Sequence, residues 1–199
     1  MSKIAVDVVL LPEGPMAERT IEANRELVEK FGKKIVLDKE RCLPHISLAM
    51  GCIEEGDIDD IGEVLKSIAE GAAFEELVVV GIEVSENLLG EKVSVFEVER
   101  KEHLQRFHYE VMEKVKPYFS YDVSGEMIYG GGEVAETTLE WIKNYPEKSS
   151  FTNFSPHVTI GYGESVGMAF PIEFAASRLA LCHLGNHCTC REVLVSFEM

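Results

Sequence analysis

The sequence predicts an α+β fold with mainly antiparallel sheets, and three observations favour this class. Runs rich in β-branched residues alternate with segments of helical periodicity, and most connections are too short for the crossovers that parallel strands require. The order of elements in the first half resembles the order in the second. No low-complexity linker separates the halves, so we expect residues 1–199 to form a single domain of two intertwined lobes, a duplicated unit with pseudo-two-fold symmetry around a central cleft.

The first half opens with a strand over Lys3 to Leu11, which is rich in Val, Ile and Leu and ends at a Pro-Glu-Gly turn. A helix is expected from Pro15 to Phe31, because apolar residues recur there at helical spacing and Gly32 suits a C-terminal stop; Asn24 is a polar exception on the apolar face. The other expected elements are a strand carrying LPHISLAM at 43–50, an acidic helix from Asp57 to Glu70, and paired strands at Glu75 to Val84 and Lys92 to Val98.

The second half begins with the best amphipathic pattern in the chain, a helix from Lys101 to Lys116. A strand-like YDVSGEMIY at 121–129 follows, then three consecutive glycines and a helix from Glu133 to Asn144. The chain closes with a strand carrying FSPHVTIGY at 154–162 and two further strands, about Phe174 to His183 and Arg191 to Phe197.

Composition limits the possible functions. With 46% hydrophobic residues and no long apolar segment, the chain reads as a folded cytoplasmic protein without a membrane span or secretion signal, and we expect a monomer. Its formal net charge is −16, which argues against an extended nucleic-acid surface, since such surfaces neutralise phosphates with Lys and Arg. A small or terminal phosphate held in a local site remains compatible with this charge.

The five cysteines are an odd number, and a chain of this size can fold without disulfides, so reduced thiols are expected. Cys182 to Cys190, CHLGNHCTC, collects five possible metal ligands. It lacks the Cys-x-x-Cys spacing of zinc sites, and we favour a reduced, partly buried hairpin that turns around Gly185-Asn186.

One motif occurs twice: Pro-His-apolar-hydroxyl-apolar appears as PHISL at 44–48 and as PHVTI at 156–160. From this chain's composition, two copies are expected by chance on the order of once in 100,000 chains of this length. Because strand side chains alternate between faces, the first copy directs His45 and Ser47 to one side and its apolar residues to the core. His157 and Thr159 match them, so two imidazoles and two hydroxyls meet if the lobes pack symmetrically.

Such a constellation suits phosphoryl chemistry. Imidazole titrates near neutral pH, so one of His45 and His157 can accept a proton while the other donates one. The hydroxyls of Ser47 and Thr159 can hold the oxygens of a phosphate as charge develops. This site needs no metal and no cofactor.

The paired motifs, HISL at 45–48 and HVTI at 157–160, resemble the signature of the two-histidine (2H) phosphoesterase superfamily, also called 2′-5′ RNA ligase-like or cyclic phosphodiesterase-like. Chain length, the strand-helix opening and the spacing of the histidines are also similar. The resemblance implies a bilobal α+β fold and metal-independent chemistry on 2′,3′-cyclic phosphates or 2′-5′ phosphodiesters of nucleotides or RNA ends. It implies that His45 and His157 are general acid and base, and that Ser47 and Thr159 bind phosphate oxygens.

Two questions stay open at this level. A non-catalytic module that binds a nucleotide or phosphorylated metabolite in the same cleft is the alternative to an enzyme. A basic residue often assists phosphate, and the sequence does not choose among Arg41, Arg100, Arg178 and Arg191.

Overall fold

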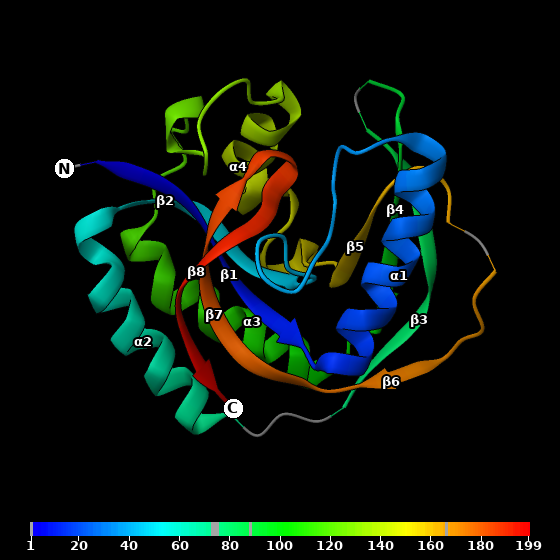
Figure 1. The fold of residues 1–199 in the computed structure, drawn as a ribbon. Coiled ribbons are helices and arrows are strands. Elements are labelled where there is room, and N and C mark those ends of the chain that lie inside the picture. The colour runs from blue at the N-terminus through cyan, green and yellow to red at the C-terminus, as the bar shows by residue number, and fades with distance from the viewer. Residues whose placement is uncertain (1, 73–75, 88, 166) are drawn as a thin grey trace.

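Two four-stranded antiparallel sheets form the framework of the protein (Figure 1). The computed structural model describes residues 2–72, 76–87, 89–165 and 167–199. Strand order is β2-β1-β7-β8 in the first sheet and β5-β4-β3-β6 in the second. The predicted α+β class with mainly antiparallel sheets is therefore confirmed.

The first sheet combines strands from both ends of the chain: β1 (Lys3–Pro12), β2 (Ile46–Glu54), β7 (Ala176–Gly185) and β8 (Thr189–Glu198). Helices α2 (Ile58–Gly71) and α3 (Glu102–Val115) contact it. The second sheet consists of β3 (Leu77–Glu86), β4 (Lys92–Val98), β5 (His157–Tyr162) and β6 (Ile172–Phe174), and α1 (Gly14–Phe31) packs against β5. The fourth helix, α4 (Glu136–Lys148), contacts β2 and the turn between β7 and β8.

The two lobes exchange helices. In the first lobe the order is β1-α1-β2, yet α1 packs against β5 of the second sheet. In the second lobe α3 lies in sequence between β4 and β5, yet it packs against β2 of the first sheet. Each sheet therefore depends on a helix whose neighbouring strands belong to the other sheet, and this reciprocal arrangement gives the fold its pseudo-two-fold character.

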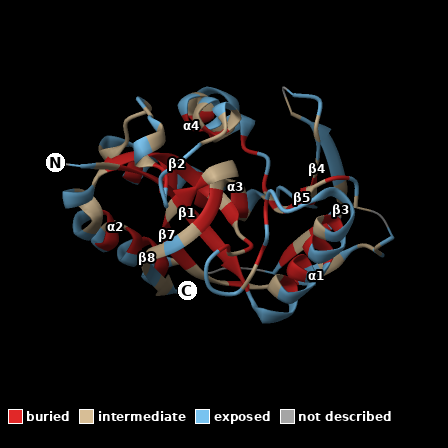
Figure 2. Ribbon diagram, turned by 45° about the horizontal axis from the view of Figure 1, so that its top comes forward, coloured by how far each residue is buried: buried red, intermediate tan, exposed pale blue. Residues whose placement is uncertain are grey.

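The motif strands occupy equivalent places, because β2 and β5 are each the edge strand of a sheet. Pro44 and Pro156 precede them, and proline suits a strand start because it cannot donate to the ladder. Figure 2 shows how burial concentrates in the strands and on the inward sides of the helices. One apolar cluster joins residues from both sheets, so the lobes share a core.

One sequence prediction about elements is wrong, and the start of another element is shifted. The strand expected at 121–129 is a loop with a short 3-10 turn at Gly125–Met127, and the residue just before it, Ser120, forms an isolated bridge with Cys52 of β2. Its apolar residues Val123 and Met127 pack on the core without needing a ladder. The strand expected over about 174–183 is confirmed as β7 (Ala176–Gly185), which pairs with β1; its expected first residue, Phe174, instead ends β6, which pairs with β3.

Within the described ranges, none of the helices combines the length and apolar character that a bilayer crossing would require.

Candidate functional site

The two copies of the motif face one cavity of about 400 Å³ between the sheets. Its lining includes His45, Ser47, His157 and Thr159, which are the four residues singled out from the sequence. The alternate residues of both strands point the other way: Ile46, Leu48, Val158 and Ile160 are each 0% exposed. The structure thus brings together all four predicted site residues.

The histidines are held in the same local geometry. His45 Nδ1 lies 2.8 Å from the carbonyl oxygen of Leu43, and His157 Nδ1 lies 2.8 Å from that of Ser155. A carbonyl only accepts hydrogen bonds, so each Nδ1 carries the hydrogen of the neutral ring. Each Nε2 is therefore the atom with the available lone pair.

Burial lowers the pKa of both histidines. For His45 the pKa is lowered from 6.5 to about 4, mainly by burial and further by the nearby charge of His157, while the bond to Leu43 acts in the opposite direction. The pKa of His157 is also lowered by burial, but the bond to Ser155 and the negative charge of Glu83 raise it. The two rings are thus inequivalent: the charge of Glu83 favours the imidazolium form of His157, whereas burial raises the pKa of Asp7, the carboxyl 3.9 Å from His45 Nε2.

The two hydroxyls also differ. Ser47 Oγ is 2.6 Å from Oδ2 of Asp7, a fully buried carboxyl on β1. Thr159 has no side-chain hydrogen bond to any of the described residues. Thr159 can therefore donate to a ligand without breaking an existing bond.

Helix α4 forms a further wall of the cavity, with Trp141, Tyr145 and Lys148 on one face at helical spacing. Trp141 is 49% exposed. Lys148 is the only Lys or Arg among the described lining residues, and it forms no ion pair with any of them. The cavity thus offers one side-chain ammonium to an anion.

The four candidate arginines do not line this cavity. Arg100 instead donates from Nη1 to the carbonyl oxygens of Thr152 and Phe154, at 3.1 and 2.9 Å. It therefore holds the segment that leads into the second motif, rather than contacting a ligand there.

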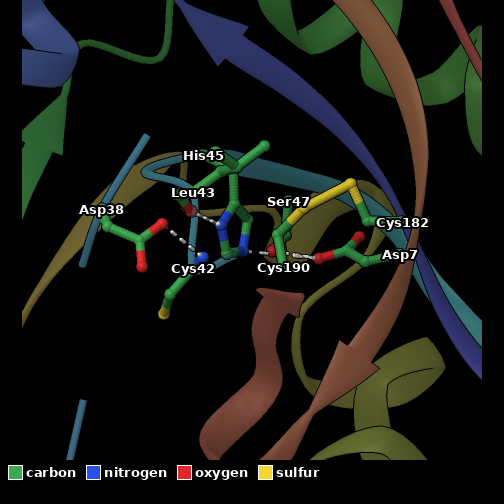
Figure 3. The surroundings of a disulfide bond; sticks show 8 residues. All are labelled: Asp7, Asp38, Cys42, Leu43, His45, Ser47, Cys182 and Cys190. Atoms are coloured by element: carbon green, nitrogen blue, oxygen red, sulfur yellow. Dashed lines mark hydrogen bonds and ion pairs between the residues drawn. A yellow bond between two sulfur atoms is a disulfide. The ribbon is translucent and has the colours of Figure 1, made fainter. Parts of the chain in front are cut away.

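The segment from Cys182 to Cys190 is a hairpin, as predicted, with its turn at Asn186–Cys188. The expectation of reduced thiols is wrong for two of its residues, because Cys182 and Cys190 form a disulfide across β7 and β8 (Figure 3). The two cysteines are not register partners, because Cys182 pairs with Val193 and Cys190 with Leu184, but their Cα atoms lie 5.6 Å apart, within the range that a disulfide spans. Among the described residues, no group of three or more His, Cys, Asp or Glu side chains is placed to hold a metal ion.

The disulfide is connected to the first motif through the backbone. Leu43 N–H donates to the carbonyl oxygen of Cys190 at 3.0 Å, and Leu43 O in turn accepts from His45 Nδ1 (Figure 3). The β8 strand therefore helps to set the orientation of the His45 ring.

Several lining residues escaped the sequence interpretation. His187, in the hairpin turn, lies in the cavity wall, where its Nδ1 is 3.0 Å from Tyr162 Oη. No local sequence pattern identifies Lys148 or Trp141 as site residues, because their place in the cavity wall depends on where α4 packs against the rest of the protein. Asp7 did have a local signal in the sequence, because it is a single carboxylate within the apolar strand KIAVDVVLLP. An Asp side chain is rarely fully buried unless it is paired or hydrogen-bonded.

Comparison with known proteins gives structural neighbours. No protein-family model and no curated protein matches the sequence. A solved structure described as a phosphoesterase aligns with 100% of this chain and 99% of its own, at 11% identity and a TM-score of 0.47. E. coli LigT complexed with phosphate aligns with 100% of this chain and 98% of its own, at 9% identity and a TM-score of 0.49. For E. coli LigT complexed with ATP, the coverage is 100% and 99%, the identity 11% and the TM-score 0.48.

Proposed function

We propose that this protein is a metal-independent phosphodiesterase that acts on a 2′,3′-cyclic phosphate or a 2′-5′ phosphodiester of a nucleotide or RNA end. The observation that carries the proposal is the matched pair of histidines. Both present Nε2 from the start of an edge strand, both have Nδ1 fixed to a carbonyl two residues earlier, and both line one cavity. Binding alone has no need of two imidazoles held in one tautomer, whereas general acid/base catalysis has.

The inequivalence of the rings supports an assignment of roles. His45 has a pKa of about 4, so in the free protein its Nε2 is unprotonated near neutral pH and suits a general base. His157 lies within the influence of Glu83, which favours its imidazolium, and it suits the general acid.

In the proposed reaction, His45 Nε2 removes a proton from water as the water oxygen attacks phosphorus in line. The bond from phosphorus to one ribose oxygen breaks, and that oxygen takes the proton from His157 Nε2. A phosphomonoester and a ribose hydroxyl result. The proton removed from water and the proton given to the leaving oxygen balance, so the pair of rings exchanges protonation states once per turnover. In the presence of an RNA hydroxyl in place of water, the same steps give transesterification, which is the ligase direction.

Phosphate recognition is assigned to the hydroxyls and to Lys148. Thr159 has its hydroxyl available, and Lys148 supplies a positive charge from α4. The cavity volume of about 400 Å³ is in the range of a small-molecule site and suits one nucleotide better than a strand of RNA. Glu83 and Glu86 also line it and disfavour additional phosphates.

The test is turnover of 2′,3′-cyclic nucleotides by purified protein in excess chelator. We expect hydrolysis in the wild type and a loss on the order of 100-fold or more in both His45→Ala and His157→Ala. His183→Asn is the matched control, because His183 bonds to Met127 O outside the cavity. Full activity in both alanine variants contradicts the proposal.

The alternative is a non-catalytic module that binds a nucleotide or phosphorylated metabolite. The Lys148 ammonium and the available Thr159 hydroxyl would serve binding as well as catalysis. Calorimetry that finds tight nucleotide binding, together with no turnover on a panel of cyclic nucleotides and 2′-5′-linked dinucleotides, favours this alternative.

A further inference from the structure

Asp7 is a carboxyl group in the middle of a buried strand. It is 0% exposed, and it pairs in register with Met50 on β2 and Cys182 on β7. Antiparallel partners share a face of the sheet, so Asp7 lies on the same face as Met50, which lines the cavity. A carboxyl group in this position sits just behind the proposed phosphate site.

Its contacts connect it to the first motif (Figure 3). Oδ2 lies 2.6 Å from Ser47 Oγ and 3.9 Å from His45 Nε2. Oδ1 is buried and has no hydrogen-bond partner among the described residues. An ionised carboxylate with one oxygen unpartnered is costly in such surroundings.

No Lys or Arg among the described residues compensates the carboxyl. The titratable groups that face it are His45 before β2, Tyr145 on α4 and Cys188 in the hairpin turn, and within the described chain no Lys or Arg pairs with it. Burial raises the pKa of Asp7 well above its usual range, and the bonds from Ser47 and the Ala49 backbone lower it only in part. The neutral acid is therefore the favoured form.

The protonation state of Asp7 decides what Ser47 can do, because a hydroxyl has one hydrogen. If Asp7 is ionised, Ser47 must donate its hydrogen to Oδ2, and its oxygen can then only accept from a ligand. If Asp7 is protonated, its own O–H can donate to Ser47 Oγ. The Ser47 hydrogen is then available to a phosphate oxygen, and no negative charge stands behind the phosphate.

We propose that Asp7 is a positioning residue that acts as a neutral acid, donating to Ser47 Oγ so that the Ser47 hydroxyl donates to a phosphate oxygen of the substrate. This assignment rests on the proposed phosphodiesterase function and adds a residue to it. It makes the two halves of the site functionally distinct, since Thr159 has no comparable partner among the described residues.

The kinetic test compares a variant that keeps the donor with one that removes it. Asp7→Asn places an amide N–H next to Ser47 Oγ, so we expect it to retain most of the wild-type kcat/KM. Asp7→Leu has a similar size and no donor, so we expect a loss similar to that of Ser47→Ala, on the order of 100-fold. Because Asp7 acts through Ser47, the double variant Asp7→Leu/Ser47→Ala should lose no more than Ser47→Ala alone. A loss in Asp7→Asn as large as that in Ser47→Ala overturns the proposal.

The infrared spectrum gives a second measurement that does not depend on turnover or on whether Asp7→Leu folds. At neutral pH, the difference spectrum of wild type minus Asp7→Asn should contain the carbonyl stretch of a protonated carboxylic acid. Asp59→Asn, which removes an exposed carboxylate on α2, should not remove that band. A carboxylate band in its place overturns the proposal. If the wild type shows the acid band and turns over no cyclic phosphate, the phosphodiesterase function has failed and the protonation of Asp7 stands.

Discussion

At the scale of single residues, the site depends on how burial sets the protonation of a few groups. His45, His157 and Asp7 are all displaced toward their neutral forms, and burial is the largest cause in each case. The sequence places both histidines and both hydroxyls, because a period-two pattern on a strand decides which side chains share a face. The sequence does not show which histidine has the higher pKa. The charge of Glu83 raises the pKa of His157 from β3, a strand of the same sheet that is distant in sequence.

The pH dependence of kcat/KM follows from the two histidine pKa values. The base must be unprotonated, so activity is lost as pH falls through the pKa of His45, about 4. The acid must be protonated, so activity is lost as pH rises through the pKa of His157, which lies below 6.5. We therefore expect a bell-shaped profile for free enzyme with its maximum on the acidic side of neutrality. The kcat profile should lie at higher pH, because the bound phosphodiester's charge stabilises imidazolium. A maximum of kcat/KM in the alkaline range is incompatible with these assignments.

Asp7 predicts a pH-dependent stability difference. Its folded pKa is raised above the unfolded value of about 3.9, so its favourable contribution is complete below that pH and is lost as pH rises toward the folded pKa. Relative to the wild type, Asp7→Asn should therefore gain stability across this window, by at most about 1.4 kcal/mol per pH unit. Denaturant unfolding at a series of pH values measures the difference. If the stability of Asp7→Asn relative to the wild type instead decreases as pH rises, the folded protein stabilises Asp7 as a carboxylate.

At the scale of elements, Asn24 explains how a helix of one lobe fixes the motif strand of the other. The residue is an exception on the apolar face of α1, and it is fully buried. Its Nδ2 donates to Ile160 O at 2.7 Å and to Ile35 O at 3.1 Å, and its Oδ1 accepts from Leu37 N at 2.9 Å. One side chain therefore ties α1 to β5 and to the segment that leads toward His45.

Asn24→Leu should destabilise the protein by roughly 2 to 4 kcal/mol, because three buried backbone groups lose their partners. Activity of the folded fraction should also fall, since β5 carries His157 and Thr159. Arg25→Leu is the control on the exposed side of the same helix, with an expected change within about 0.5 kcal/mol. Equal unfolding midpoints for the two variants would show that Asn24 does not bind the lobes together.

Element boundaries were largely predictable, and sheet membership was not. The strand at Lys92–Val98 and the helix at Glu102–Val115 match their predicted ranges closely, because both have strong local periodicity. No local sequence pattern predicts where β6 ends and β7 begins, because the boundary depends on their different partners: β6 pairs with β3 and β7 with β1. The Cys182–Cys190 disulfide likewise depends on the distance between β7 and β8 at two residues that are not register partners, which composition does not determine.

At the scale of the whole molecule, acidity and a small cavity act together on the choice of substrate. The net charge is −16, and Lys148 is the only Lys or Arg among the described residues that line the cavity. Because α1 packs against β5 and α3 packs against β2, packing of the shared core brings the two edge strands together and forms the site. Lys148 was not predictable because its place in the site depends on the docking of α4 against β2 and the hairpin turn.

Substrate length should therefore matter, and in a salt-dependent way. At low salt we expect a higher kcat/KM for a mononucleotide 2′,3′-cyclic phosphate than for a decanucleotide with the same terminus, because the acidic surface repels additional phosphates. Raising the salt to 0.1 M, where the Debye length is about 10 Å, should narrow the gap. A preference for the oligonucleotide at low salt would contradict this.

The pairing of one base and one acid in a single cavity is tested most directly by chemical rescue with imidazole in excess chelator. The account predicts that imidazole restores turnover of a 2′,3′-cyclic nucleotide to His45→Ala through its neutral form, which replaces the base, so rescue increases as pH rises until His157 loses the proton that it must donate. It predicts that rescue of His157→Ala increases as pH falls, because imidazolium replaces the acid. Rescue of both variants by the same form of imidazole, or unimpaired activity in either variant without it, would contradict the account.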